Sequence, residues 1–302
     1  MAATGRSLAA VARRRQGPPF LMAVPALAFF VIFALAPMLI VVFLSLTRWD
    51  GLGSPSWIGL ENWKRLATDP VTRNAVWLSL KVMVLSWLVQ TPVSLLLGVF
   101  IAGKQRYRAL FAVLYFIPLL LSTAAIAIAF KNLLDPNFGL ATAANVPLFA
   151  KDWLGDPNLV LYTLIFVIAW QFVPFHTLLY QAGVRQIPQS IFDAAAIDGA
   201  GAVTQFFRIT LPQLRYTIVT SSMLMLVGSL TYFDVVFILT GGGPGIATRL
   251  LPLDMYLTGF SSNEMGRASA IAVVLVVAGL ALSLALVRFS GFAKMRSQME
   301  GA

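Results

Sequence analysis

The chain has 302 residues, of which 59% are hydrophobic and 11% are charged, and its mean hydropathy is +0.82. Soluble domains carry about 25% charged residues, so this composition excludes a soluble enzyme with a polar shell, a disordered chain and a nucleic-acid-binding module. It indicates an all-α membrane protein that crosses the bilayer several times. The sequence has no cysteine and one histidine, His176, so we expect no thiolate chemistry, no metal site and no cofactor.

Six long apolar runs predict six transmembrane helices. Their approximate ranges are 20–46, 75–101, 109–130, 159–180, 217–239 and 268–287. The first run follows three arginines, as the core of a signal peptide would, but it is far longer than such a core, so we expect a retained helix. Two charged residues fall inside the runs, Lys81 in the second and Asp234 in the fifth.

The basic residues outside these runs indicate the orientation. Lysine and arginine exceed aspartate and glutamate only in the segments on the side of both termini, and this excess accounts for the whole net charge of +10. Because cytoplasmic loops are enriched in basic residues, both termini are predicted to be cytoplasmic. Residues 1–19 then form a basic cytoplasmic tail, 20–288 the transmembrane domain and 289–302 a second cytoplasmic tail. Because the orientation in the membrane explains the net charge, no nucleic-acid partner is expected. The expected surroundings of the chain are membrane lipids.

The predicted cytoplasmic segment 183–216 is too long for a simple connection and too apolar for a solvated loop. Pro188 suits the first turn of a helix, and Asp198-Gly199 should end that helix because glycine adopts positive φ without steric cost. Apolar residues recur at helical spacing around and between these points: Ile187, Ile191, Ala194, Ala195 and Ile197.

We expect this segment to form a compact knob in the cytoplasm. A second short helix after the glycine turn should expose Phe206, Phe207 and Ile209, and Pro212 should end it. An exposed apolar patch on a loop indicates a protein partner. The alternative is an amphipathic helix that lies on lipid headgroups, although such helices usually carry basic residues where this segment carries two aspartates.

The knob sequence resembles a known motif. Asp193-Ala194-Ala195, Asp198-Gly199-Ala200 and Leu211-Pro212 are similar to the EAA loop of binding-protein-dependent ABC importer permeases. Other stretches resemble the carbohydrate-uptake branch of that family, of the maltose and glycerol-3-phosphate type: Gly59-Leu60-Glu61-Asn62-Trp63, Arg73-Asn74, Phe116-Ile117-Pro118, Trp170, Pro174-Phe175, Phe233-Asp234, 239–245 and 266–270. The similarity extends over about residues 25–287. It departs from the family pattern at Asp193, where the family has glutamate.

The resemblance implies the permease fold and a permease subunit of an ATP-driven importer in the cytoplasmic membrane of a prokaryote. The loop that couples such a subunit to a separate ATPase would comprise Asp193, Ala194, Ala195, Asp198, Gly199, Ala200, Phe206, Leu211 and Pro212. The implied partners are a second homologous permease, two ATPase copies, an extracytoplasmic solute-binding protein and a carbohydrate substrate. The chain has no G-x-x-x-x-G-K-[ST] motif, so ATP and Mg should bind to the ATPase and this chain should not be an enzyme.

Two other classes of function stay open at this point. A transporter driven by an ion gradient commonly carries inverted repeats and several ionisable residues at the midplane. Here no repeat is evident and Lys81 and Asp234 are the ionisable residues inside the runs. An intramembrane enzyme would need a catalytic cluster such as two aspartates with a histidine, whereas His176 stands nearly alone.

Polar residues within the predicted helices are candidates for the substrate pathway. They are Gln90, Gln171, His176, Ser222, Ser229 and Tyr232. Amides and hydroxyls match the donors and acceptors of a sugar, and aromatic rings pack on pyranose faces. The alternative is that these residues bridge neighbouring helices, as is common in membrane bundles. Which carbohydrate is carried stays open.

The two charges inside the spans lie at similar depth. Lys81 and Asp234 each fall about 9 Å below the outer end of their predicted helix. Equal depth and opposite sign would allow an ion pair, and either charge alone would be costly in the membrane. The alternative is that Lys81 extends outward to the headgroups while Asp234 binds the glycine-rich turn at 240–243.

Overall fold

The structure is a computed structural model that describes residues 22–103, 106–139 and 151–289. The predicted tail 1–19 lies outside the described residues, as does the predicted tail 289–302 except for its first residue.

The described chain begins with one helical stretch at the edge of the molecule. Helix α1 (Val24–Phe30) passes through a π-helical turn (Val31–Leu35) into α2 (Ala36–Leu44). The π turn ends two residues before Pro37, which has no N–H to donate to the preceding turn. A small antiparallel hairpin of β1 (Thr47–Arg48) and β2 (Ser56–Trp57) follows, with Thr47 opposite Trp57.

The remaining described elements are helical. They are α3 (Glu61–Thr68), α4 (Pro70–Ile101), α5 (Arg106–Leu120), α6 (Thr123–Leu133), α8 (Val160–Arg185), α9 (Gln189–Ile197), α10 (Ala202–Gln205), a π turn (Phe206–Thr210), α11 (Leu211–Gln213), α12 (Arg215–Ser229), α13 (Asp234–Leu239), α14 (Leu251–Tyr256), a second π turn (Leu257–Ser261) and α15 (Met265–Phe289). The prediction of an all-α membrane protein is therefore confirmed.

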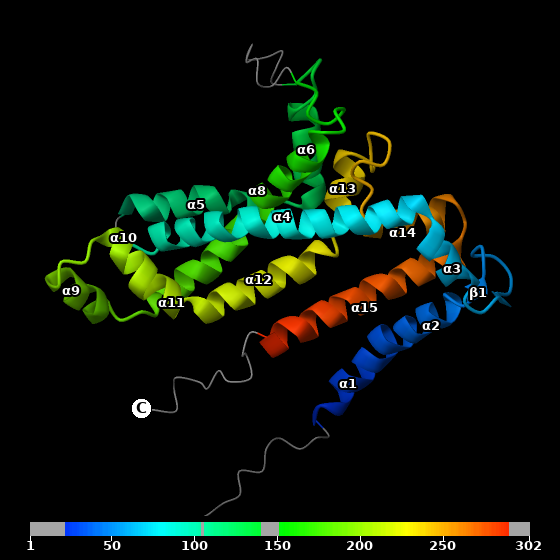
Figure 1. Ribbon diagram of the computed structural model, residues 1–302, viewed down its shortest axis with the longest axis horizontal. Helices are drawn as coiled ribbons and strands as arrows, with labels where there is room; N and C mark the ends of the chain where they lie inside the picture. Colours follow the sequence, from blue (N-terminus) through cyan, green and yellow to red (C-terminus); the bar gives the residue numbers. More distant parts are fainter. Residues whose placement is uncertain (1–21, 104–105, 140–150, 290–302) are drawn as a thin grey trace, which may run out of the picture.

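The long helices run along the length of the molecule (Figure 1). Helices α9 to α11 form one end, and α3, α14 and the β1–β2 hairpin form the other. Helix α6 stands across this direction, and α1, α2 and α15 lie together along one edge.

The core lies where α4 and α8 pack against α6 and α13. Val82, Leu164, Ile168 and Val236 are fully buried in it. Close approach of α4 and α8 depends on Gly98, because a Cβ there would lie 2.6 Å from the Cβ of Tyr180. The burial of these apolar side chains fixes α4 and α8 against each other and so positions the polar residues that the two helices carry.

Each predicted span coincides with helix, but two spans are broken. Four helices of the described chain are long and apolar enough to cross a membrane, and a fifth span would be the bent pair α5 and α6. The predicted span 109–130 is not one continuous helix, because α5 and α6 meet at 98°. Ser122 starts the new helix by accepting a hydrogen bond from the Ala125 N–H at 3.2 Å.

The predicted span 217–239 is also interrupted. Helix α12 ends at Ser229 and α13 starts at Asp234. The Thr231 hydroxyl donates to the Gly228 carbonyl at 2.7 Å, and the Phe233 N–H donates to the Thr231 carbonyl at 2.8 Å. These bonds satisfy backbone groups that the break would otherwise leave unpaired, which makes non-helical backbone tolerable at this depth.

Candidate functional site: a membrane cavity and a terminal knob

The break between α12 and α13 opens a cavity of about 440 Å³. Its wall comes from α5, α6, α8, α12 and α13, and it is lined by Leu119, Thr123, Phe172, Phe175, His176, Leu224, Met225, Gly228, Thr231, Tyr232, Phe233, Asp234 and Val235. The volume lies within the range of about 300–1,000 Å³ that is typical of small-molecule sites.

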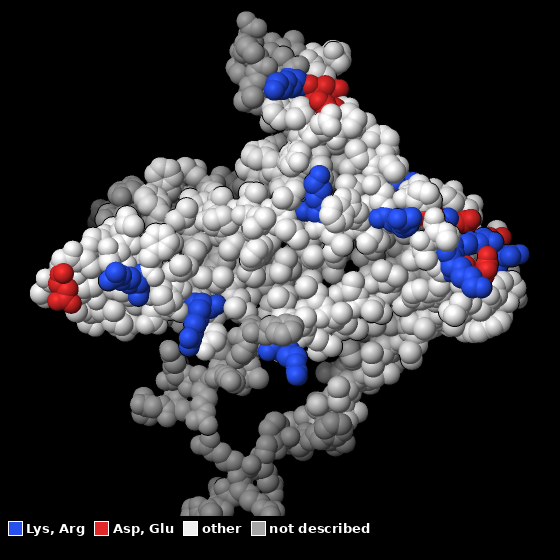
Figure 2. All heavy atoms as spheres, viewed as in Figure 1, with Lys and Arg blue, Asp and Glu red and all other residues white. Residues whose placement is uncertain are grey.

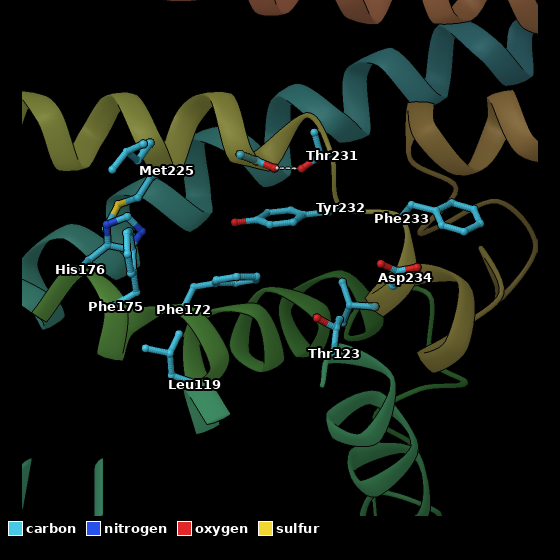
Figure 3. A pocket seen from close by; sticks show the side chains of 13 residues that line it. Leu119, Thr123, Phe172, Phe175, His176, Met225, Thr231, Tyr232, Phe233 and Asp234 are labelled. Atoms are coloured by element: carbon cyan, nitrogen blue, oxygen red, sulfur yellow. Dashed lines mark hydrogen bonds between the residues drawn. The ribbon is translucent and has the colours of Figure 1, made fainter. Parts of the chain in front are cut away.

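Aromatic rings dominate the cavity wall. Phe172 of α8 and Tyr232 of the α12–α13 break stack with ring centroids 5.8 Å apart and an interplanar angle of 26°. Figure 3 shows this pair in the middle of the cavity, with His176 and Met225 toward one end and Thr123 and Asp234 toward the other. The cavity therefore combines flat apolar surface with polar groups at both ends.

Polar side chains behind the wall hold the lining residues. The imidazole Nδ1 of His176 lies 2.9 Å from the hydroxyl oxygen of buried Ser221, which orients the ring. The amide Nε2 of Gln171 donates to Thr123 Oγ1 at 2.7 Å and ties α8 to the start of α6. Hydrogen bonds of this kind keep the lining residues in one arrangement.

The structure separates the six predicted pathway residues into two groups. His176 and Tyr232 line the cavity, and Gln171 reaches it through Thr123. The other three do not line it. Ser222 accepts a hydrogen bond from Trp87 Nε1 at 2.9 Å and so bridges α12 to α4. Ser229 donates to the Leu226 carbonyl at 2.7 Å, and Gln90 is fully buried within α4. Contact of any of the six with substrate stays a prediction.

Several lining residues were not candidates from the sequence. Thr123, Phe172, Met225 and Thr231 line the cavity. Thr123 and Thr231 lie at the two helix breaks, whereas Phe172 and Met225 lie within α8 and α12. A hydroxyl-bearing residue three positions after a glycine, as at Gly228 and Thr231, is the sequence signal that could have indicated the second break.

The ion pair between Lys81 and Asp234, one of the two alternatives, is absent from the ion pairs of the described residues. Lys81 Nζ lies over the ring of Tyr162, 5.7 Å from its centroid, and lines a separate cavity between α4 and α8. Asp234 is exposed in the cavity at the α12–α13 break. The prediction treated span five as one straight helix, and the break places Asp234 at the start of a new helix instead.

The knob formed by 183–216 contains the predicted glycine turn. Gly199 has φ +77°, the Gly199 N–H donates to the Ala196 carbonyl at 3.1 Å, and the Ala200 N–H donates to the Ala195 carbonyl at 2.8 Å. This pair of bonds is the Schellman arrangement that ends a helix at glycine. Asp193 accepts a hydrogen bond from Gln189 Nε2 at 3.1 Å and is exposed. Backbone hydrogen bonds within the knob therefore fix the glycine turn.

Two details of the knob differ from the prediction. Phe206 is partly buried against the cluster of Leu95, Tyr180 and Leu214, whereas Phe207 is 59% exposed. The second ring is therefore the more accessible of the two to a partner. Pro212, which has no backbone N–H, lies in the first turn of α11, directly after the π turn, and α11 ends one residue later, at Gln213.

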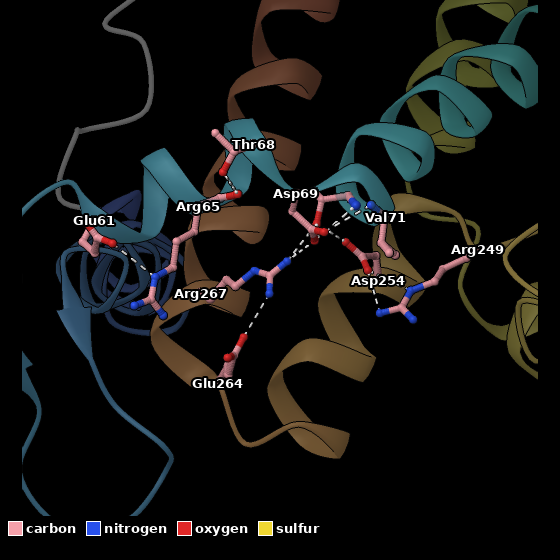
Figure 4. Close-up of polar contacts among 10 residues, drawn as sticks. Glu61, Arg65, Thr68, Asp69, Val71, Arg249, Asp254, Glu264 and Arg267 are labelled. Carbon is pink, nitrogen blue, oxygen red and sulfur yellow. Dashed lines mark hydrogen bonds and ion pairs between the residues drawn. The ribbon is translucent and has the colours of Figure 1, made fainter.

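The opposite end is held together by ion pairs (Figure 4). Arg249 Nη2 lies 2.8 Å from Asp254 Oδ1, and the carboxylate of Asp254 is 1% exposed. Thr72 Oγ1 lies 2.9 Å from the other oxygen of Asp254. Arg267 pairs with Asp69 and also contacts Glu264 at 3.1 Å. The start of α4, helix α14 and the start of α15 are joined in this way.

Asp69 also caps helix α4. Burial alone would raise its pKa, but hydrogen bonds from the Thr72 hydroxyl and the Val71 N–H, together with the charge of Arg267, lower the pKa of Asp69 below its ordinary value. The carboxylate therefore stays ionised where it caps the helix and pairs with Arg267.

Charged side chains of both signs gather at the α3–β1 end, and a broad surface with only a few isolated basic side chains separates that end from the knob (Figure 2). A belt with few charges between two polar ends is the surface of a protein that spans a membrane. Together with the helical fold, the belt defines the class of the molecule as a multi-pass membrane protein with a cavity inside its helices and a protruding knob.

Comparison with known proteins identifies the family. Residues 90–291 match the family described as binding-protein-dependent transport system inner membrane component. The chain is 35% identical over 278 residues to YurN of Bacillus subtilis, described as a probable ABC transporter permease, with 90% of this chain and 95% of that protein covered. It is 34% identical over 255 residues to MsmF of Streptococcus mutans, a multiple sugar-binding transport system permease, with 82% and 86% covered.

The fold agrees with a solved importer. A permease chain of a bacterial ABC transporter involved in import of the acidic polysaccharide alginate has a TM-score of 0.78 and 23% identity, with 90% of this chain and 94% of that chain covered. The chain therefore belongs to the binding-protein-dependent inner membrane components and is an ABC importer permease.

Proposed function

We propose that this permease translocates a carbohydrate across the cytoplasmic membrane of a prokaryote and is driven by ATP hydrolysis on a separate subunit. The cavity at the α12–α13 break carries the proposal. Its stacked rings of Phe172 and Tyr232 offer the flat apolar surface on which a pyranose packs, and Thr123, Thr231 and Asp234 offer partners for sugar hydroxyls. Relatives named as sugar permeases, such as MsmF, support the same substrate class.

The knob is the proposed coupling element. Movement of an ATPase can move the membrane helices only through a rigid contact, because a flexible loop would change its own conformation and leave the helices in place. The knob supports this role because α9 ends in a hydrogen-bonded glycine turn and Phe206 packs onto α4 and α8 residues. The exposed side chains of Ile197, Val203 and Phe207 offer an apolar docking face.

We expect one such chain to enclose only part of a pathway, as the family resemblance implies. We expect a second homologous permease to close it, two ATPase copies to bind the knobs, and an extracytoplasmic binding protein to deliver the substrate. The alginate importer, solved in complex with a pentasaccharide-bound periplasmic protein, supports that kind of assembly. ATP and Mg would bind to the ATPase subunits.

Uptake by proteoliposomes tests the proposal. The chain is reconstituted with its partner permease and ATPase, and the binding protein is added outside with its bound saccharide. Uptake should require ATP and should persist when ionophores collapse ion gradients. Uptake that stops with the ion gradient, and continues without ATP, would instead support the ion-driven class.

The glycine turn of the knob gives the sharpest test of coupling. Gly199→Val should abolish ATP-driven uptake, because a β-branched residue is strained at φ +77°. Gly201→Val is the matched control, since Gly201 also has open space around it but has φ −69°. Normal uptake by the Gly199 variant, or equal loss in both variants, would contradict the proposed coupling role.

A further inference from the structure

Lys81 has an unusual position for a lysine in a transmembrane helix. Its helical neighbours at the same face, Trp77, Val84 and Leu88, have exposed fractions of 65%, 45% and 52%. These residues are spaced four, three and seven positions from Lys81, so they form one stripe on α4 that faces the surroundings of the helix bundle. Lys81 therefore lies on a surface that lipid can reach.

The depth of Lys81 coincides with the headgroups. From Lys81 to Ile101, the last residue of α4, the helix rises about 30 Å, which is the thickness of the hydrocarbon core. Basic residues follow Ile101 directly in the sequence, as expected where a span reaches the cytoplasm. Trp77 lies one turn further out, where tryptophan is enriched at the membrane–water interface. Lys81 thus lies at the outer boundary of the apolar layer.

The charge of Lys81 is not neutralised by the protein. None of the ion pairs among the described residues includes it, and its ammonium lies over the ring of Tyr162, 5.7 Å from the centroid. The aspartate on the neighbouring loop, Asp156, accepts hydrogen bonds from the backbone N–H of Asn158 at 2.8 Å and from its amide at 3.2 Å. A cation in this position requires an anionic partner or water.

A cavity of about 420 Å³ surrounds the lysine. Polar groups of Asn74, Asn158 and Tyr162 share its wall with Lys81, and apolar Leu78 and Leu161 line its floor. The Asn74 amide donates to the Ile246 carbonyl at 3.3 Å, which joins the outer loop to α4 at the rim. The site therefore offers one cation, two amides and a phenol beside exposed apolar helix.

We infer that this cavity binds the phosphate headgroup of an anionic phospholipid in the outer leaflet, with Lys81 as the cation that selects it. The acyl chains of that lipid lie along Val84 and Leu88, which continue the same face of α4 into the membrane. A lysine at a membrane surface favours an anionic lipid over a zwitterionic one by about fivefold. The inference concerns lipid and is independent of the transported substrate.

Photo-crosslinking of the full-length chain in bilayers tests the inference. The bilayers contain equal phosphatidylcholine and phosphatidylglycerol plus a trace of phosphatidylglycerol that carries a diazirine next to its headgroup, and mass spectrometry maps the adducts. Adducts should fall on the α4 segment around Lys81 and near Tyr162. Unlabelled phosphatidylglycerol should suppress them about fivefold more effectively than phosphatidylcholine does.

Variants identify the selecting residue. Lys81→Gln and the apolar Lys81→Met should both abolish the preference for the anionic competitor, whereas Lys81→Arg should keep it. Lys64→Gln is the control, because it removes an exposed lysine from α3 on the same side of the molecule.

An unchanged preference in both Lys81 variants would overturn the inference. Suppression by inorganic phosphate as strong as by the lipid would also overturn it, since it would indicate a site for free anions. The assay contains no saccharide and no ATP, so its failure would leave the proposed transport function untouched.

Discussion

The two ends of this permease differ in their side chains: one end has paired polar side chains, and the other has exposed apolar side chains. At the α3–α14 end, Arg249, Asp254, Thr72, Asp69 and Arg267 bind one another, and the paired side chains are mostly buried. At the knob end, the side chains of Ile197, Val203 and Phe207 are 88%, 72% and 59% exposed. None of the described ion pairs involves a knob residue.

This difference means that one end contributes to the stability of the fold and the other to the binding of a partner. A polar network that is internally paired contributes to folding, because removal of one member leaves a buried group without its partner. An exposed apolar surface contributes nothing to the isolated chain and becomes favourable only when a partner covers it. Substitutions at the two ends should therefore move different measurements.

The largest loss of stability is expected from the buried ion pair. Arg249→Ala leaves the carboxylate of Asp254, which is 1% exposed, without its cation, and should lower the free energy of unfolding by about 3 kcal/mol. Arg65→Ala removes the pair with Glu61, in which both side chains are about half exposed (50% and 44%), and should cost at most about 0.5 kcal/mol. Denaturant unfolding of the purified chains measures both. Equal losses would show that the outer network does not stabilise the fold.

A smaller loss should follow from crowding at the same end. A Cβ at Gly266 would collide with the Thr47 carbonyl and lie 3.1 Å from the Asn62 amide nitrogen, so Gly266→Ala should cost about 2 kcal/mol. Gly228→Ala is the control, because no atom lies within 4 Å of a Cβ there and alanine favours the helix by up to about 1 kcal/mol. A thermal unfolding midpoint that falls in both variants would contradict this packing argument.

The smallest change in stability, with a large change in association, is expected at the knob. Phe207→Ala should alter the free energy of unfolding by no more than about 0.5 kcal/mol, since its ring is mostly exposed. The same variant should weaken ATPase binding by about 30-fold, as loss of an aromatic anchor costs about 2 kcal/mol at an interface.

The adjacent ring provides the contrast. Phe206→Ala should destabilise the chain by about 1–2 kcal/mol, because Phe206 packs against Tyr180 and Leu214. Binding titrations with the ATPase and unfolding curves should thus rank these two phenylalanines in opposite order. The same ranking in both measurements would remove the distinction between the two ends.

The sequence alone determined the features that depend on neighbours along the chain. Apolar runs long enough for the bilayer predicted helix in all six ranges, and Asp198-Gly199 predicted the turn that the structure has at φ +77°. Both depend on local physics: the length of an apolar run and the freedom of glycine at positive φ. The resemblance carried by the knob and the outer motifs also identified the family correctly.

The tertiary structure decided where the helices break and which side chains meet. Hydropathy is averaged over about 19 residues, so short breaks such as those before Thr123 and Asp234 leave the average unchanged. The cavity lies at these breaks, Phe172 and Tyr232 stack within it, and Asp234 lines this cavity whereas Lys81 lines another. The depth of a residue along its helix could be counted from the sequence. The direction in which its side chain points within the helix bundle could not, because that direction depends on packing between residues far apart in the chain.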